Sequence, residues 1–469
     1  MDRRKFLQNS LALGVSAAAV GVSGCRQQPL DLEPAAAFKP GEPMPWINWA
    51  ANQSCTPEWR SAPASVDELM ESLKTAKGCV RAVGAGHSFS PVVPTDDTLI
   101  SMDLLSGLVR HDAEKQQATL LAGTRMHTMG PMLHSVGQAL PNMPDMDYPS
   151  IGGAIANSVH ATGTTFGSMS SYVTGLKLAT LSGDLIECSA DKNPDIFKAA
   201  QTSIGSLGIV SEVTLQNQAA FNLTEVSSAE NLNDVLDNIE QRCNDHRHFE
   251  IFPIPYSDTC LTIATDIAKP GDQAVGEDDP QAVNTVRRVF DATSWIPVVG
   301  EGLYDKVLTT ALAGESETVR TGPSYQVFPH VRVVRFREME YTVPAEAGPA
   351  CVREILKAIK DKHLPMCFPL EYRYVKGDDI WLSMFEGQAG CSISVHQFGD
   401  LDYKKVFAEI EPIFWKYGGR PHWGKIHTLD ASKLAKLYPR HWQDFHEVRR
   451  ELDPQGRLMN RHLKTIFGS

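Results

Sequence analysis

Apolar residues in the first half of the chain follow two different spacings. Ser65-Val66-Asp67-Glu68 has the form of a capping box, and the apolar residues after it recur on one helical face, which predicts a helix that ends before Gly78. Short apolar runs flanked by turn residues predict strands instead. These strands are expected at residues 79–83, 99–102, 118–122, 173–180, 185–188 and 208–215. The alternation predicts a mixed α and β domain.

Longer strand-like runs dominate the second half. They predict strands at residues 248–254, 331–343, 370–375 and 392–398, with a helix at about 350–362. This pattern favours an antiparallel sheet backed by helices, that is, a second domain of α+β type. An acidic, loop-prone stretch around Pro270 and Gly276–Pro280 is interpreted as part of an insertion over residues 266–326.

The composition narrows the class of protein. With 469 residues, 42% hydrophobic and 21% charged, the chain is of ordinary globular composition and long enough for two or three domains. Lys+Arg 44 against Asp+Glu 56 gives a formal net charge of -12, which disfavours binding to nucleic-acid phosphates. No basic patch in the sequence offsets this charge. We therefore expect a soluble fold with no nucleic-acid partner.

The N-terminal residues predict an export signal. Arg3-Arg4-Lys5-Phe6-Leu7-Gln8 precedes an apolar run shorter than the roughly 20 residues of a spanning helix, an arrangement that resembles a twin-arginine signal. Val22-Ser23-Gly24-Cys25 resembles a lipobox that would place a lipid on Cys25; an ordinary signal cleaved near Gly24 is the alternative. We expect a signal peptide at residues 1–24, a linker at 25–45, and a periplasmic protein exported by the twin-arginine machinery.

The cysteines and histidines do not indicate a metal site. Nine cysteines are irregularly spaced, and the eight after Cys25 are numerous enough for a disulfide or two in an oxidising compartment. His422 and His427 are five residues apart, a spacing that fits one helical face poorly, and no third ligand stands out. We therefore expect no metal. The sequence also lacks a GxSxG or HExxH motif, so hydrolase chemistry has no support.

Three glycine clusters favour a phosphate-containing cofactor. Glycine allows backbone amides to approach a phosphate closely. The first cluster, Gly84-Ala85-Gly86-His87-Ser88, lacks the third glycine of a nicotinamide-binding fingerprint, and taken alone it is also compatible with an ordinary turn. The clusters contribute the cofactor-binding candidates Gly84, Ala85, Gly86, His87, Ser88, Ile151, Gly152, Gly153, His160, Gly163, Gly208 and Val210.

A charged pair stands out in one predicted strand. Glu371 and Arg373 are two residues apart, so their side chains share one face of the strand, while Leu370, Tyr372 and Tyr374 point to the other. An ion pair on a surface strand is the commoner outcome of this spacing. His396 lies on another predicted strand, and a later segment carries His422 and Lys425. If the second domain covers the cofactor, these side chains converge.

These motifs together resemble the vanillyl-alcohol-oxidase-type flavoproteins, and within them the aldonolactone and alditol oxidases typified by D-arabinono-1,4-lactone oxidase. The stretches that carry the resemblance are Val83–Ser90, the expected loop Ile151-Gly152-Gly153, Glu371-Tyr372-Arg373, Asp379–Ser383 and Pro421-His422-Trp423-Gly424-Lys425. The resemblance covers nearly the whole chain after the signal. The segment Asn157–Gly163 departs from the Thr-His-Gly-Thr loop of that family.

The resemblance implies a two-domain α+β fold with an FAD-binding α+β domain at 46–217 and an antiparallel-sheet cap or substrate domain at 218–440. Residues 441–469 would return to the flavin domain. His87 occupies the position whose imidazole is joined covalently to the flavin, and His160 would shape the flavin pocket. The implied catalytic residues are Glu371, Arg373, His396, His422 and Lys425.

The expected activity is oxidation of a CH–OH group of a sugar-derived polyol or aldonolactone by hydride transfer to FAD. Lys425 and Arg373 are candidates to stabilise negative charge on the reduced flavin, and Glu371 to bind substrate hydroxyls. His396 and His422 are candidates for hydroxyl binding or proton transfer, and the base is left open. The electron acceptor is oxygen or a membrane acceptor. The alternative is a non-catalytic, exported sugar-binding lipoprotein that retains the fold.

Overall fold

The computed structural model of the protein describes residues 45–272, 282–293, 300–313 and 317–468. The expected signal peptide, Cys25 and all but the last residue of the expected linker lie outside the described residues, as does Gly276–Pro280. Residues Pro43–Ser469 group as one unit, so the sheets below belong to one body.

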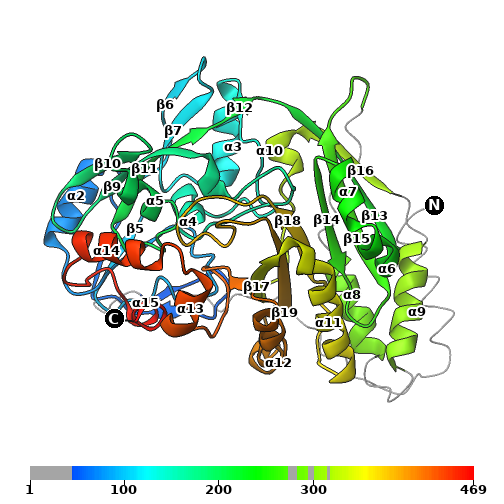
Figure 1. The fold of residues 1–469 in the computed structure, drawn as a ribbon. Helices are drawn as coiled ribbons and strands as arrows, with labels where there is room; N and C mark the ends of the chain where they lie inside the picture. Colours follow the sequence, from blue (N-terminus) through cyan, green and yellow to red (C-terminus); the bar gives the residue numbers. More distant parts are fainter. Residues whose placement is uncertain (1–44, 273–281, 294–299, 314–316, 469) are drawn as a thin grey trace. The chain divides into compact units, whose positions relative to one another are not determined.

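The first half of the described chain forms two main sheets (Figure 1). A three-stranded parallel sheet has the order β3-β5-β4, and a five-stranded antiparallel sheet the order β10-β9-β11-β7-β6. The bounds are β3 (Trp59–Ser61), β4 (Val80–Val83), β5 (Thr98–Ser101), β6 (Leu108–Asp112), β7 (Gln117–Leu121), β9 (Val173–Ala179), β10 (Leu185–Ser189) and β11 (Ile209–Gln216). The pairs β1 (Trp46–Ile47) with β2 (Ser54–Cys55) and β8 (Gln138–Ala139) with β12 (Gln218–Ala219) are short.

The helices of this half are α2 (Val66–Thr75), α3 (Met126–Ser135), α4 (Ile151–Ala156) and α5 (Pro194–Ala200). The predicted capping box at the start of α2 is confirmed, because the Ser65 side chain accepts a hydrogen bond from the Glu68 amide. Leu69 and Leu73 of this helix are buried. The Ile151-Gly152-Gly153 segment was expected to be a loop, which is wrong: it is the first turn of α4, capped by Ser150.

The second half forms one eight-stranded antiparallel sheet of order β16-β13-β15-β14-β18-β19-β17-β20, which confirms the α+β prediction. Its strands are β13 (Asn222–Asn231), β14 (His248–Pro253), β15 (Thr259–Ile267), β16 (Thr318–Pro323), β17 (Phe336–Pro344), β18 (Glu371–Val375), β19 (Gly390–Phe398) and β20 (Arg420–Pro421). The strand expected to start at Val331 starts at Phe336 instead; the Arg332 side chain in the preceding loop pairs with Asp145.

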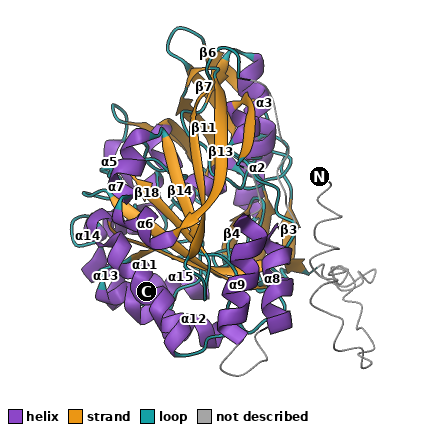
Figure 2. Cartoon of the chain, turned by 90° about the vertical axis from the view of Figure 1, so that its right-hand side faces the viewer, coloured by secondary structure: helices purple, strands orange, loops and turns teal. Residues whose placement is uncertain are grey.

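The two faces of this sheet differ in character because successive residues of a strand point to opposite sides. One face carries apolar residues such as Tyr341, Tyr372 and Ile393, and packs against helices (Figure 2). Helices that contact the sheet include α6 (Leu232–Asp237), α7 (Ile239–Asp245), α11 (Gly348–Asp361) and α12 (Tyr403–Lys416). The opposite face carries buried charged residues. The segment interpreted as an insertion contributes α8 (Ala282–Thr293), α9 (Gly300–Ala313), β16 and the short α10 (Ser324–Val327).

The C-terminal segment packs on elements of the first half. It contains α13 (Ala431–Leu437), α14 (Trp442–Leu452) and α15 (Arg461–Phe467), and α14 contacts α5. Buried Arg81 of β4 donates to the carbonyl of Leu458, and the Asn460 amide donates to the carbonyl of Pro91. These contacts tie the end of the chain to the strand that precedes the first glycine cluster.

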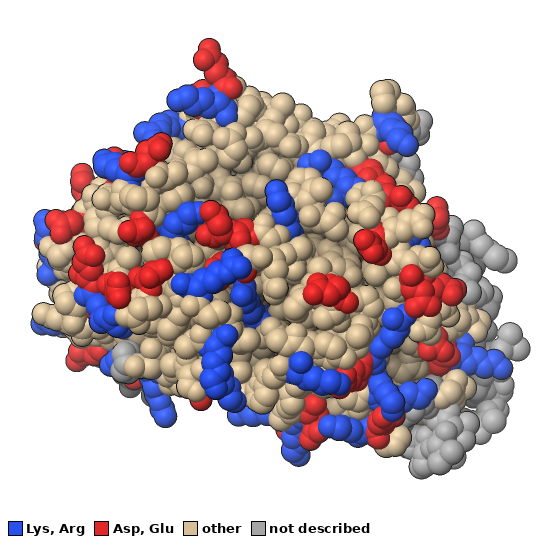
Figure 3. All heavy atoms as spheres, in the orientation of Figure 1, with Lys and Arg blue, Asp and Glu red and all other residues tan. Residues whose placement is uncertain are grey.

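The described cysteines are all free, so none of the disulfides that the sequence left possible is formed among them. Among the described residues, no helix is both long and apolar enough to cross a membrane. On the face drawn in Figure 3, lysine and arginine residues are interspersed with aspartate and glutamate. That face therefore presents no continuous basic surface for a polyanion.

Candidate active site

The charged face of the second sheet gathers the residues expected to be catalytic. Glu371 and Arg373 of β18 are both buried, which rules out a surface ion pair. Glu371 lies opposite Ser394 of β19, and His396 of the same strand lies opposite Glu338 of β17. The alternation that the sequence predicted for β18 therefore extends over three neighbouring strands.

Two carboxylates hold the Arg373 guanidinium. Its Nη2 donates to Oε2 of Glu340 at 3.2 Å, and its Nη1 lies 3.0 Å from Oε1 of Glu371. The second contact is an ion pair without hydrogen-bond alignment, so Oε1 of Glu371 retains an unused acceptor position. Burial raises the pKa of Glu371 to about 7, against the opposing effect of Arg373. This carboxyl is therefore poised to gain or lose a proton near neutral pH.

The two histidines in the cluster differ in which nitrogen is available. Nδ1 of His396 is 3.0 Å from the Pro369 carbonyl and must donate to it, which leaves Nε2 with a lone pair, 3.9 Å from Oε2 of Glu371. Nδ1 of His422 accepts from the Gly424 amide, which places the proton on Nε2. Burial lowers the pKa of His422 to about 3. His422 is thus a neutral donor.

Lys425 brings a positive charge to this cluster. Its ammonium group is hydrogen-bonded to Oε2 of Glu338. Within the described ranges, Glu338, Glu371 and His396 are the one group of side chains placed closely enough to hold a metal ion. The Lys425 ammonium already pairs with the Glu338 carboxylate, so the positive charge beside this group comes from a side chain of the protein.

His87 lies in the turn after β4, between two aromatic rings. Its imidazole stacks on Trp49 at 5.2 Å and on Tyr148 at 5.9 Å between ring centroids. Nδ1 of His87 is buried and has no hydrogen-bond partner among the described residues. Burial, reinforced by Arg125 and Lys425, lowers its pKa to about 4. The ring is neutral and oriented, and it offers a nitrogen that the protein itself does not use.

The glycine clusters pack closely against neighbouring segments of the protein. A Cβ on Gly84 would lie 2.0 Å from Oγ of Ser150, and one on Gly152 would lie 3.0 Å from the Ala122 carbonyl oxygen. Gly86 has a φ of 67°, which favours glycine. Within the described chain, the backbone amides of residues 84–88 donate to no protein acceptor. Amides that have no protein acceptor fit the phosphates of FAD.

The remaining cofactor candidates lie on neighbouring segments. Gly163 pairs with Val375 at the end of β18. This pairing joins residues 157–163 after α4, here called the flavin-side segment, to the second sheet. Gly208, with a φ of 156°, precedes Val210 on β11. His160 points into the charged cluster, where its Nε2 is hydrogen-bonded to Oε1 of Glu340.

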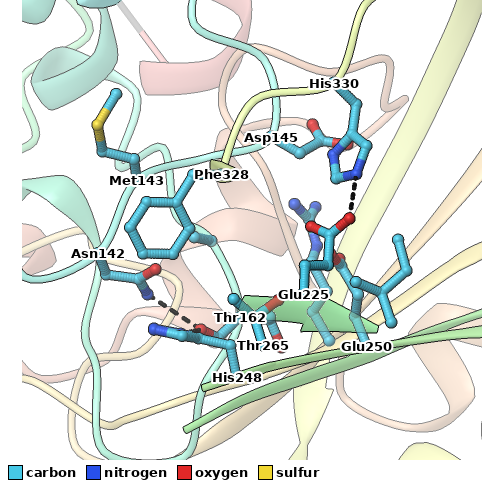
Figure 4. Close-up of a pocket in the computed structure, with 13 residues that line it drawn as sticks. Asn142, Met143, Asp145, Thr162, Glu225, His248, Glu250, Thr265, Phe328 and His330 are labelled. Carbon is cyan, nitrogen blue, oxygen red and sulfur yellow. Dashed lines mark hydrogen bonds and ion pairs between the residues drawn. The ribbon is translucent and has the colours of Figure 1, made fainter. Parts of the chain in front are cut away.

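A small cavity is lined in part by Arg373. It lies over β13, β14 and β15, and it is capped by Phe328 and by the segment that contains Asn142 and Asp145 (Figure 4). His330 faces Glu225 across it. Glu250 of β14 is the cross-strand neighbour of Arg373 and lines the same cavity. Burial and the neighbouring Glu371 raise the pKa of Glu250 well above its usual value, which disfavours the ionised form of this carboxyl.

The sequence did not single out Glu338, Glu340, Glu250 or Asp145. The first two are spaced like Glu371 and Arg373, two apart in an apolar strand, and this is the signal that would have found them. Glu250 occurs alone in a short apolar strand. Asp145 is in a loop, and no local pattern marks it.

Comparisons with known proteins give family matches in both halves of the chain. A family model described as D-arabinono-1,4-lactone oxidase matches residues 213–466, and one described as FAD binding domain matches residues 57–189. An L-gulono-1,4-lactone dehydrogenase of Mycobacterium tuberculosis is 33% identical over 433 residues, covering 90% of this chain and 99% of its own. An L-gulonolactone oxidase of Bos taurus is 30% identical over 90% of this chain and 97% of its own. An alditol oxidase of a Streptomyces species is 26% identical over 90% and 98%.

Solved structures show the same fold. A solvent-stable cholesterol oxidase superimposes with a TM-score of 0.75 at 18% identity, covering 90% of this chain and 97% of that chain. Cholesterol oxidase from Brevibacterium sterolicum gives 0.71 at 16% identity, covering 90% and 96%. At such identities the likeness establishes the fold alone, and substrate choice must be argued from the site.

Proposed function

Because this chain belongs to the D-arabinono-1,4-lactone oxidase family and is an FAD-dependent oxidoreductase acting on CH–OH donors, we propose that its substrate is a sugar-derived lactone. Relatives named for lactones are 33% and 30% identical to it, whereas the alditol oxidase is 26% identical. Those relatives are oxidases or dehydrogenases, and the non-catalytic binding lipoprotein has no support among them.

The observation that carries this proposal is the Glu371–Arg373 pair, buried beside His396 on the charged sheet face. Arg373 and Lys425 supply positive charge to a bound, hydroxyl-rich ring and to the reduced cofactor. Glu371 accepts the hydroxyl proton, because its pKa is about 7 and one of its oxygens has no hydrogen bond. His422 donates from Nε2 and is excluded as the base. When bound, FAD supplies the two-electron acceptor for the carbinol carbon.

Steady-state rates test the substrate class. We expect kcat/KM for L-gulono-1,4-lactone or D-arabinono-1,4-lactone to exceed that for xylitol and sorbitol by at least about tenfold. Glu371→Gln should lower kcat by roughly 100-fold or more, as loss of a general base does. Equal or better turnover of the alditols would refute the lactone assignment.

Covalent attachment of FAD through His87 is the finer proposal for the cofactor. The buried, unpartnered Nδ1 and the neutral ring support it. In His87→Ala, acid precipitation should release the flavin into the supernatant. His127 also contacts Tyr148, with ring centroids at 5.7 Å, so His127→Ala is a matched control that should keep its flavin in the pellet. Flavin that pellets with His87→Ala would disprove the linkage.

We further propose that the protein is exported as a folded holoprotein and anchored through Cys25. Support comes from Arg3-Arg4 and Val22-Ser23-Gly24-Cys25 in the sequence. Replacing Arg3 and Arg4 by lysine should keep the protein in the cytoplasm, and Cys25→Ser should release it from the membrane fraction. Export of the double-lysine variant at the normal level would contradict the twin-arginine route.

The proposed electron acceptor is a membrane acceptor, which anchoring would favour over oxygen. Peroxide formed per substrate oxidised should then be well below one when a quinone is present. A stoichiometric yield of peroxide under the same conditions would identify the protein as an oxidase.

A further inference from the structure

Glu340 is a buried carboxylate with donors from three different segments. It lies on β17 and is 1% exposed. It accepts hydrogen bonds from Nε2 of His160, from Oγ of Ser394 at 2.9 Å, and from Nη2 of Arg373 at 3.2 Å. These partners come from the flavin-side segment after α4, from β19 and from β18.

The two hydrogen bonds of His160 fix the orientation of its ring. Its Nδ1 is 3.0 Å from the Ala161 carbonyl oxygen, and its Nε2 faces the Glu340 carboxylate. The neighbouring His160 and Arg373 hold the pKa of Glu340 well below its usual value, against the effect of burial. Glu340 is therefore an anionic acceptor, and Nε2 of His160 is the donor in their hydrogen bond.

Arg373 has a competing carboxyl on its other side. Glu250 is its cross-strand neighbour, and both residues line the same small cavity. Glu340 prevails because its carboxylate is aligned to accept from Nη2, whereas burial and the neighbouring Glu371 disfavour the ionised form of Glu250. The hydrogen bond to Glu340 thus keeps Arg373 beside Glu371.

We propose that Glu340 is a positioning residue that couples the flavin-side segment to substrate binding by holding the His160 imidazole and the Arg373 guanidinium in one geometry. It touches neither substrate nor cofactor and acts through these two side chains. The inference rests on the proposed function insofar as Arg373 binds substrate.

Kinetics of the flavin-loaded enzyme test whether Glu340 positions Arg373. Glu340→Gln should lower kcat/KM for the aldonolactone by roughly 100-fold, as expected when one partner of a buried, hydrogen-bonded charge pair is lost. Glu250→Gln alone should change it by less than about threefold. The double variant should regain about tenfold over Glu340→Gln, because the competing carboxyl is gone. No loss in Glu340→Gln, or no recovery in the double variant, would overturn the proposal.

Glu411→Gln is the matched control. Glu411 is a buried carboxylate that accepts from Tyr341 and Thr428, and its partner Tyr341 lies on the apolar side of the same strand. Its loss should lower the melting temperature and leave kcat/KM within about twofold. If Glu411→Gln lowers kcat/KM as much as Glu340→Gln does, the effect of Glu340 is merely structural.

The hydrogen bond between His160 and Glu340 provides a readout that needs no turnover. In the wild-type holoprotein labelled with 15N-histidine, Nε2 of His160 should carry a proton at pH 7.5. The signal is assigned by its absence in His160→Gln, and it should shift in Glu340→Gln. A wild-type His160 whose Nε2 carries no proton would refute the proposal. If no lactone or polyol is oxidised but Nε2 of His160 is protonated, the proposed function fails and the coupling geometry stands.

Discussion

Replacing Glu371 by glutamine should lower activity and raise stability together. The carboxyl is buried and its pKa is about 7, so the folded protein binds this proton more tightly than an unfolded chain does. Ionising Glu371 therefore costs folding free energy as the pH rises from about 4.5 through 7. Glutamine has the same shape and no proton to lose, so the variant avoids that cost.

The magnitude follows from the two pKa values. With a folded pKa of about 7 and an unfolded pKa of about 4.5, the cost of ionisation is about 0.8 kcal/mol at pH 5 and about 3.4 kcal/mol at pH 8.5. The stability of Glu371→Gln relative to wild type should thus rise by about 2.5 kcal/mol between these pH values.

Urea unfolding of both holoproteins at pH 5 and pH 8.5, with equal flavin occupancy, measures this difference. Glu411→Gln serves as the comparison, because its buried carboxylate accepts hydrogen bonds from the Thr428 amide and hydroxyl and from Tyr341, and should lose stability at both pH values. A difference between wild type and Glu371→Gln that does not change with pH would refute the assignment of a strained, titrating carboxyl.

Three further predictions concern the carboxyl of Glu371, the first glycine cluster and the buried side chain of Arg81. In the wild type, kcat/KM should rise with pH and level off above about pH 7, because Glu371 must be ionised to accept a proton; a profile flat from pH 5.5 to 8.5 would contradict this. Gly84→Ala should displace the Ser150 side chain from its capping position on α4, which should cost about 1 kcal/mol of stability. The variant should also retain flavin less well, measured as free flavin after gel filtration. Full retention of flavin would show that the Ser150 cap can shift. Arg81→Met should lower the free energy of unfolding in urea by about 3 kcal/mol, because buried Arg81 donates to four backbone carbonyls, those of Val92, Ile204, Gly205 and Leu458. Arg110 is exposed, so Arg110→Met should have little effect. Equal effects of the two substitutions would be inconsistent with this account.

Local patterns in the sequence were sufficient for most of the elements. The capping box located α2, and the alternation in Glu371-Tyr372-Arg373 identified a strand with one charged face. Local patterns failed where distant contacts decide the structure. The small residues Gly152 and Gly153 disfavour a helix, yet α4 forms because Ser150 caps it and Ile151 and Ile155 are buried.

Local sequence patterns also identified only part of the charged cluster at the site. The sequence pointed to Glu371, Arg373, His396, His422 and Lys425, and the structure brings all five to one region. It did not point to Glu340, whose importance arises from register across β17, β18 and β19 and from His160, which is 180 residues away in the chain. Register between strands so far apart cannot be read from one sequence.

Anaerobic mixing of the oxidised holoprotein with D-arabinono-1,4-lactone or L-gulono-1,4-lactone tests the central claim most directly. The visible absorption of the flavin should bleach in a single turnover with at least one lactone, and Glu371→Gln should slow the bleaching by roughly 100-fold or more. A flavin that stays fully oxidised with every lactone and alditol offered, in a protein that carries its full complement of FAD, would contradict the account.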